Sequence, residues 1–170
     1  MLNFSRCLIL GGEEFPTLSE ISKWIPLGFN TCGKRIFNIY GITEVSCWAS
    51  IYEFTVGDSL NQIGNIPIGK PLDDFTDFRI CDDTGHVLAF KACKGELEIG
   101  SCIRHCFIPE YDENIKILQS QEIIYRKTGD FVERDELGNI IYLGRTNNTI
   151  KRMGKRICLG KCVYIYCFTF

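Results

Sequence analysis

The first 61 positions alternate between short apolar runs and one longer segment with helical spacing. Cys7–Leu10 is an apolar run that ends at two glycines, as a buried strand does before a turn. Residues 17–25 place their apolar side chains at helical spacing, with Thr17 or Ser19 as the N-cap. Lys34–Tyr40 is a second apolar run before a glycine. Strand, helix and strand in this order predict α/β architecture, in which ligands bind at the carboxyl ends of the strands.

From about residue 62 the pattern changes to short β-type runs separated by polar turns. Turn residues cluster at 82–85 and 135–139. Runs at this spacing predict antiparallel hairpins that form a small barrel or sandwich against the α/β part. The predicted strands are Phe75–Cys81, Val87–Phe90, Glu96–Ile99, Ile123–Arg126, Phe131–Glu133 and Ile140–Leu143.

Composition narrows the class of protein. The 170 residues are 45% hydrophobic and 24% charged, which is typical of a globular domain and excludes a disordered tail or a coiled coil. The net charge is −2 without a basic run, so neither a nucleic acid nor a membrane surface is an expected partner. The chain has neither an apolar stretch of about 20 residues nor the layout of a signal peptide, so we expect a cytoplasmic protein.

The ten cysteines allow two interpretations. Most lie within apolar runs, where a reduced cysteine behaves as a small hydrophobic residue, and we expect mostly buried thiols. The alternative is a structural zinc site, although neither candidate set has the usual paired spacing. The two sets are Cys102, His105 and Cys106, and Cys158, Cys162 and Cys167.

Four short motifs carry residues suited to chemistry. Tyr40–Glu44 follows the second predicted strand and offers a hydroxyl and a carboxylate, although taken alone it also fits a strand that ends at a capped helix. Gly95–Gly100 alone is an amphipathic strand between glycines. Tyr125–Asp130 and the basic segment Gly144–Ile157 follow, and a basic run is usually a solvated face. Their order and spacing carry more information than any single motif.

Taken together, the motifs resemble the adenylate-forming superfamily: acyl-CoA synthetases, luciferases and the adenylation domains of peptide synthetases. The family patterns are Y-G-x-T-E, G-E-L-x-I-x-G, Y-R/K-x-T-G-D and G-R-x-D-x-x-x-K-x-x-G-x-R-I, in this order. Ile66–Pro71 is similar to the family's I-G-x-P turn, and the resemblance runs from about Cys7 to Ile157.

The resemblance implies the C-terminal part of a large adenylation domain. It assigns residues 1–61 to the α/β portion, 62–143 to an antiparallel β portion, and 144–157 to a hinge before the mobile C-terminal domain. Asn147 takes the hinge position, where the family often has aspartate. Residues 158–170 form a hydrophobic tail with the composition of an aggregation-prone strand, as at the end of a truncated or alternatively spliced reading frame.

The resemblance also implies an activity. Such enzymes couple a carboxylate to the α-phosphate of ATP, release pyrophosphate, and pass the acyl group to the thiol of coenzyme A or of phosphopantetheine on a carrier domain. The expected substrate is a small carboxylate or amino acid, with β-alanine as a candidate. The implied ligands are therefore ATP or AMP and Mg²⁺.

Site residues follow from the same resemblance. Thr43 and Glu44 are the implied catalytic pair, because a hydroxyl can donate to the α-phosphate and Mg²⁺ prefers carboxylate oxygens. Asp130 offers two acceptors to the two ribose hydroxyls, and Arg145 adds a charged donor. The implied nucleotide-binding residues are Gly12, Ile39, Tyr40, Thr43, Asp130 and Arg145.

The implied pocket for the carboxylate substrate lies near the two predicted parallel strands. Its residues are Ile9, Gly11, Ile39, Cys47 and Trp48. Trp48 would fill the pocket for a small substrate, whereas plain core packing explains Cys47 and Trp48 equally well.

Two departures from the family bear on activity. The family's phosphate-gripping segment, rich in Ser, Thr and Gly and ending in Pro-Lys, is not found in the 170 residues. After Gly100 the usual glycine and tyrosine continuation is replaced by the residues 101–106. We therefore expect turnover by these residues alone to be near background, and the alternative function is a non-catalytic chain with a partial nucleotide site.

Overall fold

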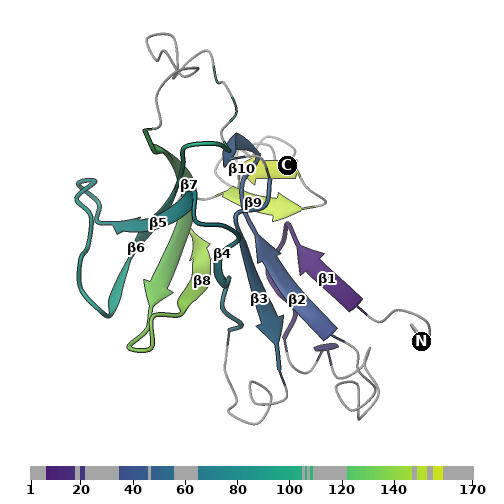
Figure 1. The fold of residues 1–170 in the computed structure, drawn as a ribbon. Helices are drawn as coiled ribbons and strands as arrows, with labels where there is room; N and C mark the ends of the chain where they lie inside the picture. The colour runs from purple at the N-terminus through teal and green to yellow at the C-terminus, as the bar shows by residue number, and fades with distance from the viewer. Residues whose placement is uncertain are drawn as a thin grey trace, which may run out of the picture.

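The structure is a computed structural model of two four-stranded sheets and a two-stranded hairpin (Figure 1). It describes residues 7–17, 20–21, 35–45, 47–55, 65–104, 106, 108, 122–146, 149–152 and 155–158, the last two ranges by their backbone. Within this part no helix is long and apolar enough to cross a membrane.

The first sheet has the order β1-β2-β3-β4. Strands β1 (Cys7–Gly11) and β2 (Arg35–Tyr40) are parallel, which confirms the two strands predicted for this part. Strands β3 (Ser50–Phe54) and β4 (Lys70–Pro71) were not predicted. Strand β3 pairs antiparallel with β2, and β4 pairs antiparallel with β3. The register places Gly11 opposite Ile39, so the carboxyl ends of β1 and β2 lie side by side.

Thr17 and Glu20 form the start of the predicted helix. The Glu20 backbone N–H donates to Thr17 Oγ1 at 3.4 Å, and the Thr17 backbone N–H donates to Glu20 Oε2 at 2.9 Å. This reciprocal pair is a capping box, which satisfies amide groups that the first helical turn leaves open. Glu20 and Ile21 are helical, and the rest of the predicted helix lies outside the described residues.

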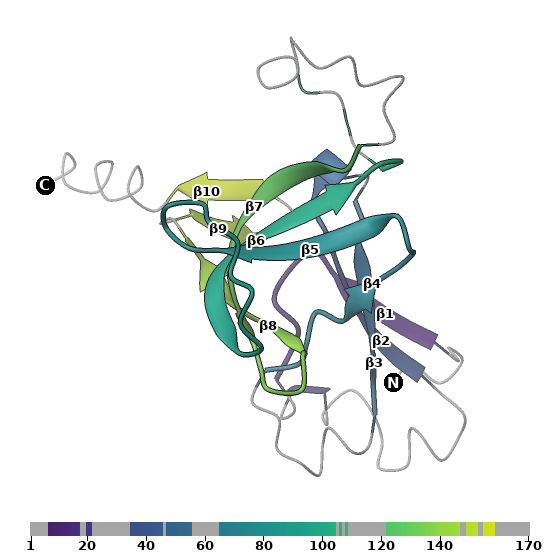
Figure 2. The same cartoon turned by 60° about the vertical axis from the view of Figure 1, so that its left-hand side comes forward.

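The second sheet is antiparallel throughout, in the order β5-β6-β7-β8. Its strands are β5 (Thr76–Cys81), β6 (Cys93–Ser101), β7 (Ile124–Arg134) and β8 (Ile140–Arg145). A separate hairpin pairs β9 (Thr149–Arg152) with β10 (Lys155–Cys158). Figure 2 shows β5, β6 and β7 side by side in one sheet and β1, β2 and β3 side by side in the other.

Two strand predictions for this part were wrong. Val87–Phe90 is not a strand, because Val87 forms only an isolated bridge to Cys81. The runs Ile123–Arg126 and Phe131–Glu133 belong to one strand, β7, which continues through register irregularities against both neighbours. The predicted fold class, the C-terminal part of an adenylation domain with an α/β portion and an antiparallel β portion, is confirmed, and among the described residues the second sheet is open, with β5 and β8 as its edges.

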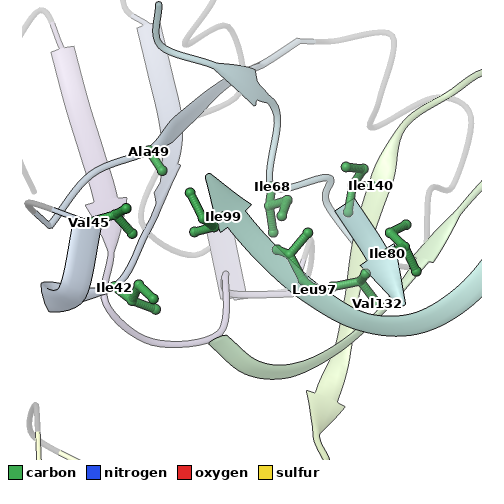
Figure 3. Packing of buried hydrophobic residues seen from close by; sticks show 9 residues of the cluster. All are labelled: Ile42, Val45, Ala49, Ile68, Ile80, Leu97, Ile99, Val132 and Ile140. Carbon is green, nitrogen blue, oxygen red and sulfur yellow. The ribbon is translucent and has the colours of Figure 1, made fainter. Parts of the chain in front are cut away.

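The main core lies between the second sheet and the loop that follows β2 (Figure 3). Leu97 and Ile99 alternate with half-buried glutamates along β6, so one face of the strand is apolar. That face packs against the loop after β2, where Ile42 and Val45 are also buried. The buried members of this core are Ile42, Val45, Ala49, Ile68, Ile80, Leu97, Ile99, Val132 and Ile140.

Residues 65–69 join the two sheets by hydrogen bonds. The backbone N–H of Ile68 donates to the carbonyl of Ile140 at 2.8 Å. Buried Ser50 donates through its hydroxyl to the Ile68 carbonyl at 2.6 Å, and the Asn38 amide donates to the Pro67 carbonyl at 2.9 Å. Because these partners belong to both sheets, the carboxyl end of β2 is held against β7 and β8.

Candidate functional site

Three side chains meet where β2 ends against β7 and β8. The Tyr40 hydroxyl donates to Asp130 Oδ2 at 2.5 Å, and Arg145 Nη1 lies 3.0 Å from Asp130 Oδ1. Asp130 and Arg145 are paired in the register of β7 and β8, whereas Tyr40 is 90 positions away in the sequence. We call Tyr40, Asp130 and Arg145 the acidic triad.

The backbone before Asp130 is shaped to place its carboxylate. Gly129 has φ +70°, a conformation that glycine adopts without strain, and a Cβ there would lie 2.9 Å from Arg145 Nη1. The Thr128 hydroxyl donates to the Leu97 carbonyl at 2.7 Å and accepts the Asp130 N–H at 3.0 Å. Arg145 Nη1 also donates to the Thr128 carbonyl at 2.6 Å.

Two members of the acidic triad are almost fully buried, and Tyr40 is half-buried. The side chains of Asp130 and Arg145 are 4% and 9% exposed. Burial first, and then the negative charge and hydrogen bond of Asp130, raise the pKa of Tyr40 well above its usual value. Arg145 Nη2 is buried and has no hydrogen-bond partner in the described part of the chain. This guanidinium nitrogen is therefore a buried donor whose hydrogen-bonding capacity is unused among the described residues.

Thr43 and Glu44 lie on a short 3-10 turn, Thr43–Val45, directly after β2. Val45 is buried in the core, which orients the turn so that Thr43 is exposed and Glu44 is half-buried. Gly41 allows this tight path, since a Cβ there would collide with the carbonyl oxygen of Cys47. The turn thus presents a hydroxyl and a carboxylate at the carboxyl end of β2.

Three of the five predicted pocket residues come together beside this turn. A Cβ on Gly11 would contact the side chain of Ile39 and lie 3.0 Å from the Trp48 ring. Trp48 is 39% exposed, so core packing alone does not account for it. Ile9 is 55% exposed two register pairs before Gly11, and Cys47 is exposed with φ +73°.

Gly12 lies just beyond β1 and is exposed, with φ +87° and open space around its Cα. Open space of this kind permits close approach of a ligand to the backbone. Asn147, His105 and the hydrophobic tail from residue 159 onward lie outside the described residues.

The cysteine prediction was wrong for much of the described part. Of its six free cysteines only Cys81 is buried, while Cys7, Cys47 and Cys106 are exposed. No group of three or more metal-ligating side chains occurs among the residues that the structure describes.

Sequence reasoning did not identify two residues that contact the loop after β2. Arg104 Nη1 donates to the Trp48 carbonyl at 2.7 Å. Cys106 donates through its backbone N–H to the Glu44 carbonyl and through its thiol to the Thr43 carbonyl, both at 3.0 Å. The sequence did show that the residues after Gly100 depart from the family pattern. Sequence spacing does not reveal that this segment contacts the loop after β2.

No protein-family model matches the chain. The chain is 38% identical over 156 residues to the beta-alanine-activating enzyme of Drosophila melanogaster. The aligned region covers 91% of this chain and 14% of that relative's length. The chain therefore spans about one-seventh of this curated relative.

Solved structures of adenylation domains have the same fold. PA1221, a peptide-synthetase protein containing adenylation and PCP (carrier) domains, matches with a TM-score of 0.73 and 21% identity, over 96% of this chain and 33% of its own. The Vibrio cholerae adenylation domain AlmE, in complex with glycyl-adenosine-5'-phosphate, matches with a TM-score of 0.68 and 21% identity, over 91% of this chain and 28% of its own. The four ordered motifs and the similarity to the Drosophila enzyme support membership of the chain in the adenylate-forming, AMP-binding superfamily, and the solved structures show the same fold.

Proposed function

We propose that the chain supplies the adenosine-binding and carboxylate-binding parts of an ATP-dependent, AMP-forming activation site. The observation that carries the proposal is the convergence of the acidic triad, the Thr43–Glu44 turn and the Gly11–Trp48 contact at the carboxyl ends of β1 and β2. Ligands in α/β proteins bind at this edge of the sheet.

In the proposed reaction a carboxylate oxygen of the substrate attacks the α-phosphorus of ATP. A new P–O bond forms, the bond to the pyrophosphate oxygen breaks, and the products are an acyl-adenylate and pyrophosphate. A thiolate then attacks the acyl carbon and AMP leaves. The exposed Thr43 hydroxyl is suited to donate to an α-phosphate oxygen, where charge rearranges in the transition state.

The acidic triad suits the adenosine half. The carboxylate of Asp130 has two oxygens, which match the two hydroxyls of a ribose in number and hydrogen-bonding character. The hydroxyl of Tyr40 is fixed by Asp130, which orients the ring and leaves an aromatic face for a purine. Arg145 Nη2 supplies a buried donor beside the same carboxylate.

Glu44 fits a magnesium ion by the chemistry of its donor atoms. Mg²⁺ is usually held by one or two carboxylates together with phosphate oxygens and water, and Glu44 is the carboxylate of the 3-10 turn. When bound there, Mg²⁺ would neutralise phosphate charge. The exposed hydroxyl of Thr43 beside it would position the α-phosphate.

The substrate that we propose is a small amino acid such as β-alanine. Support comes from the Trp48 ring, which closes the space over Gly11, and from the name of the Drosophila relative. The thiol acceptor that we propose is phosphopantetheine on a carrier domain or coenzyme A, by analogy with the adenylation and carrier domains of PA1221. A cytoplasmic location stays a prediction.

A specific observation favours the second candidate, a non-catalytic chain with a partial nucleotide site. Asp130 is 3% exposed, and each of its carboxylate oxygens already contacts Tyr40 or Arg145. A ribose must therefore open this cluster before it reaches the carboxylate, which weakens binding by the cost of that opening.

Calorimetric titration of the 170-residue chain tests the proposal. The ligands are a stable β-alanyl-adenylate mimic and AMP, and the test variant is Thr43→Val, which keeps side-chain volume and removes the hydroxyl. A hydrogen bond to a charged group contributes about 1.5–3 kcal/mol, so we expect the variant to bind the mimic about 10- to 100-fold more weakly. Thr84→Val, in the exposed turn after β5, is the matched control and should bind like the parent chain.

Two results separate the candidates. Saturable binding of both ligands, weakened by Thr43→Val, supports the activation site. If AMP binds and the β-alanyl group adds no affinity, the partial nucleotide site is the better description. Absence of heat with both ligands, from a chain that melts cooperatively, contradicts both.

A further inference from the structure

The segment that follows β6 departs from the family pattern, and the proposed function gives it no role. Ser101 starts it with a local turn, because the Ser101 hydroxyl oxygen accepts the backbone N–H groups of Ile103 at 3.3 Å and Arg104 at 3.0 Å. This turn directs Arg104 back toward the loop between β2 and β3, where its guanidinium contacts the Trp48 carbonyl.

The guanidinium of Arg104 also contacts two residues outside that loop. Its Nη2 lies 3.2 Å from Asp73 Oδ2 and donates to Thr76 Oγ1 at 3.1 Å. Thr76 in turn donates to Asp73 Oδ1 at 2.8 Å, so the two acceptors are fixed relative to each other. The guanidinium is planar, and contacts on Nη2 therefore fix the direction of Nη1, which donates to the Trp48 carbonyl at 2.7 Å.

The loop that Arg104 contacts contains one residue with a strained backbone. Cys47, directly before Trp48, has φ +73°, the only positive φ of a non-glycine residue in the described part. The loop is pinned on both sides of Trp48, by the Cys47 N–H to the Ile42 carbonyl at 3.1 Å and the Ala49 N–H to the Tyr40 carbonyl at 2.8 Å.

Trp48 itself forms the wall of the proposed carboxylate pocket. Its ring lies over Gly11, close enough that a single added methyl group would contact it at 3.0 Å. Because Arg104 binds the backbone of Trp48 rather than its ring, Arg104 can fix the wall without touching a substrate. Cys106 binds the carbonyls of Thr43 and Glu44, so one segment contacts both ends of the loop.

We propose that Arg104 is a positioning residue that sets the size of the acyl pocket by fixing the Trp48 backbone. The inference rests on the proposed function for the identity of the pocket. The contact between Arg104 and the Trp48 carbonyl is independent of that function, and the two are tested by different measurements.

The first measurement compares two ligands in Arg104→Ala. AMP probes only the adenosine half, whereas the β-alanyl-adenylate mimic also fills the acyl pocket. We expect the affinity for the mimic to fall about 10-fold, because a hydrogen bond from a charged group to the wall is lost, and the affinity for AMP to stay within about 2-fold. Arg104→Lys keeps the charge but loses the planar fork that links Nη1 to Nη2, so it should recover only part of the lost affinity.

The second measurement follows Trp48 directly and needs no ligand. The chain has two tryptophans, so a Trp24→Phe background leaves Trp48 as its single indole. In this background Arg104→Ala should increase acrylamide quenching of Trp48 fluorescence about 2-fold, and Arg104→Lys should increase it less. Arg79→Ala is the matched control, since Arg79 is an arginine of β5 with a 42% exposed side chain and an ion pair to Asp77.

The outcomes separate the two ideas. Unchanged quenching in Arg104→Ala overturns the positioning role, and so does an equal loss of affinity for AMP and the mimic, which indicates general destabilisation. If the parent chain binds neither ligand, the proposed function fails, and the quenching measurement alone decides the role of Arg104. Increased quenching with a selective loss of mimic affinity supports both.

Discussion

Replacing Asp130 by asparagine removes one charge from the acidic triad and keeps the shape of the side chain. Asp130 and Arg145 are 4% and 9% exposed at a separation of 3.0 Å, so water does little to screen the pair. The variant leaves a buried guanidinium without its counter-ion. Stability, rather than ligand binding, therefore reports on this change most directly.

The magnitude follows from the contacts. Removing one partner of a buried ion pair costs about 3–5 kcal/mol. The lower end applies here, because an asparagine oxygen can still accept from Arg145 Nη1 and its amide can donate to the Tyr40 hydroxyl, which is able to accept. We expect a loss of about 3 kcal/mol in the free energy of unfolding. For a chain of this length the loss corresponds to a Tm lower by roughly 6–12 °C.

Asp77 is a matched control, because it also has a tyrosine and an arginine as partners but is more exposed. Asp77 accepts a tyrosine hydroxyl, that of Tyr125, at 2.6 Å and lies 3.9 Å from Arg79, but its side chain is 52% exposed. Solvent screening limits such a pair to at most about 1 kcal/mol. Urea unfolding of Asp130→Asn and Asp77→Asn, followed by circular dichroism, gives the two losses under identical conditions.

The reasoning depends on the difference in burial between these two clusters. Equal losses in Asp130→Asn and Asp77→Asn would show that burial does not strengthen the Asp130 contacts. A loss below about 1 kcal/mol in Asp130→Asn would show that Arg145 finds another partner, and the assignment of a buried, functional triad would have to be abandoned.

Two further predictions concern the core and the tyrosines. Leu97→Ala, at a side chain that is 0% exposed, should lower the free energy of unfolding by about 2–5 kcal/mol in urea, whereas Leu137→Ala, at 87% exposure, should change it by no more than about 0.5 kcal/mol; similar losses would contradict the assigned core. The raised pKa values of Tyr40 and of Tyr125, the latter to about 12, should make stability fall as pH rises above 10, because the unfolded chain loses these protons first. Tyr40→Phe should flatten that fall above pH 10, and an unchanged slope would place Tyr40 in solvent.

Local sequence patterns predicted most of the strands correctly because strand formation depends on nearby residues. The apolar run before Gly11 became β1, and Lys34–Tyr40 became β2 with one residue less. The capping box between Thr17 and Glu20 also needs only neighbours. The prediction failed at Val87–Phe90, where the run has β-type residues but forms only a single bridge. Apolar composition alone does not supply a partner strand.

Candidate site residues were found through the family resemblance, and the structure added their arrangement. Tyr40 and Asp130 are 90 positions apart, and nothing in the motif spacing indicates that their side chains share a hydrogen bond. Likewise, the sequence showed only that the segment after Gly100 departs from the family pattern. It did not predict the contact between Arg104 and the Trp48 carbonyl, 56 positions away.

The sequence by itself determined most of the strands, the turns and the chemical groups available to the site, because propensity, capping and turn formation act over a few residues. Tertiary structure decided which of those groups meet. The pairing of β7 with β8 places Arg145 opposite Asp130, and the hydrogen bonds of residues 65–69 bring the end of β2 to the same carboxylate. Such contacts depend on strand register and on the packing of two sheets, which are properties of the whole chain.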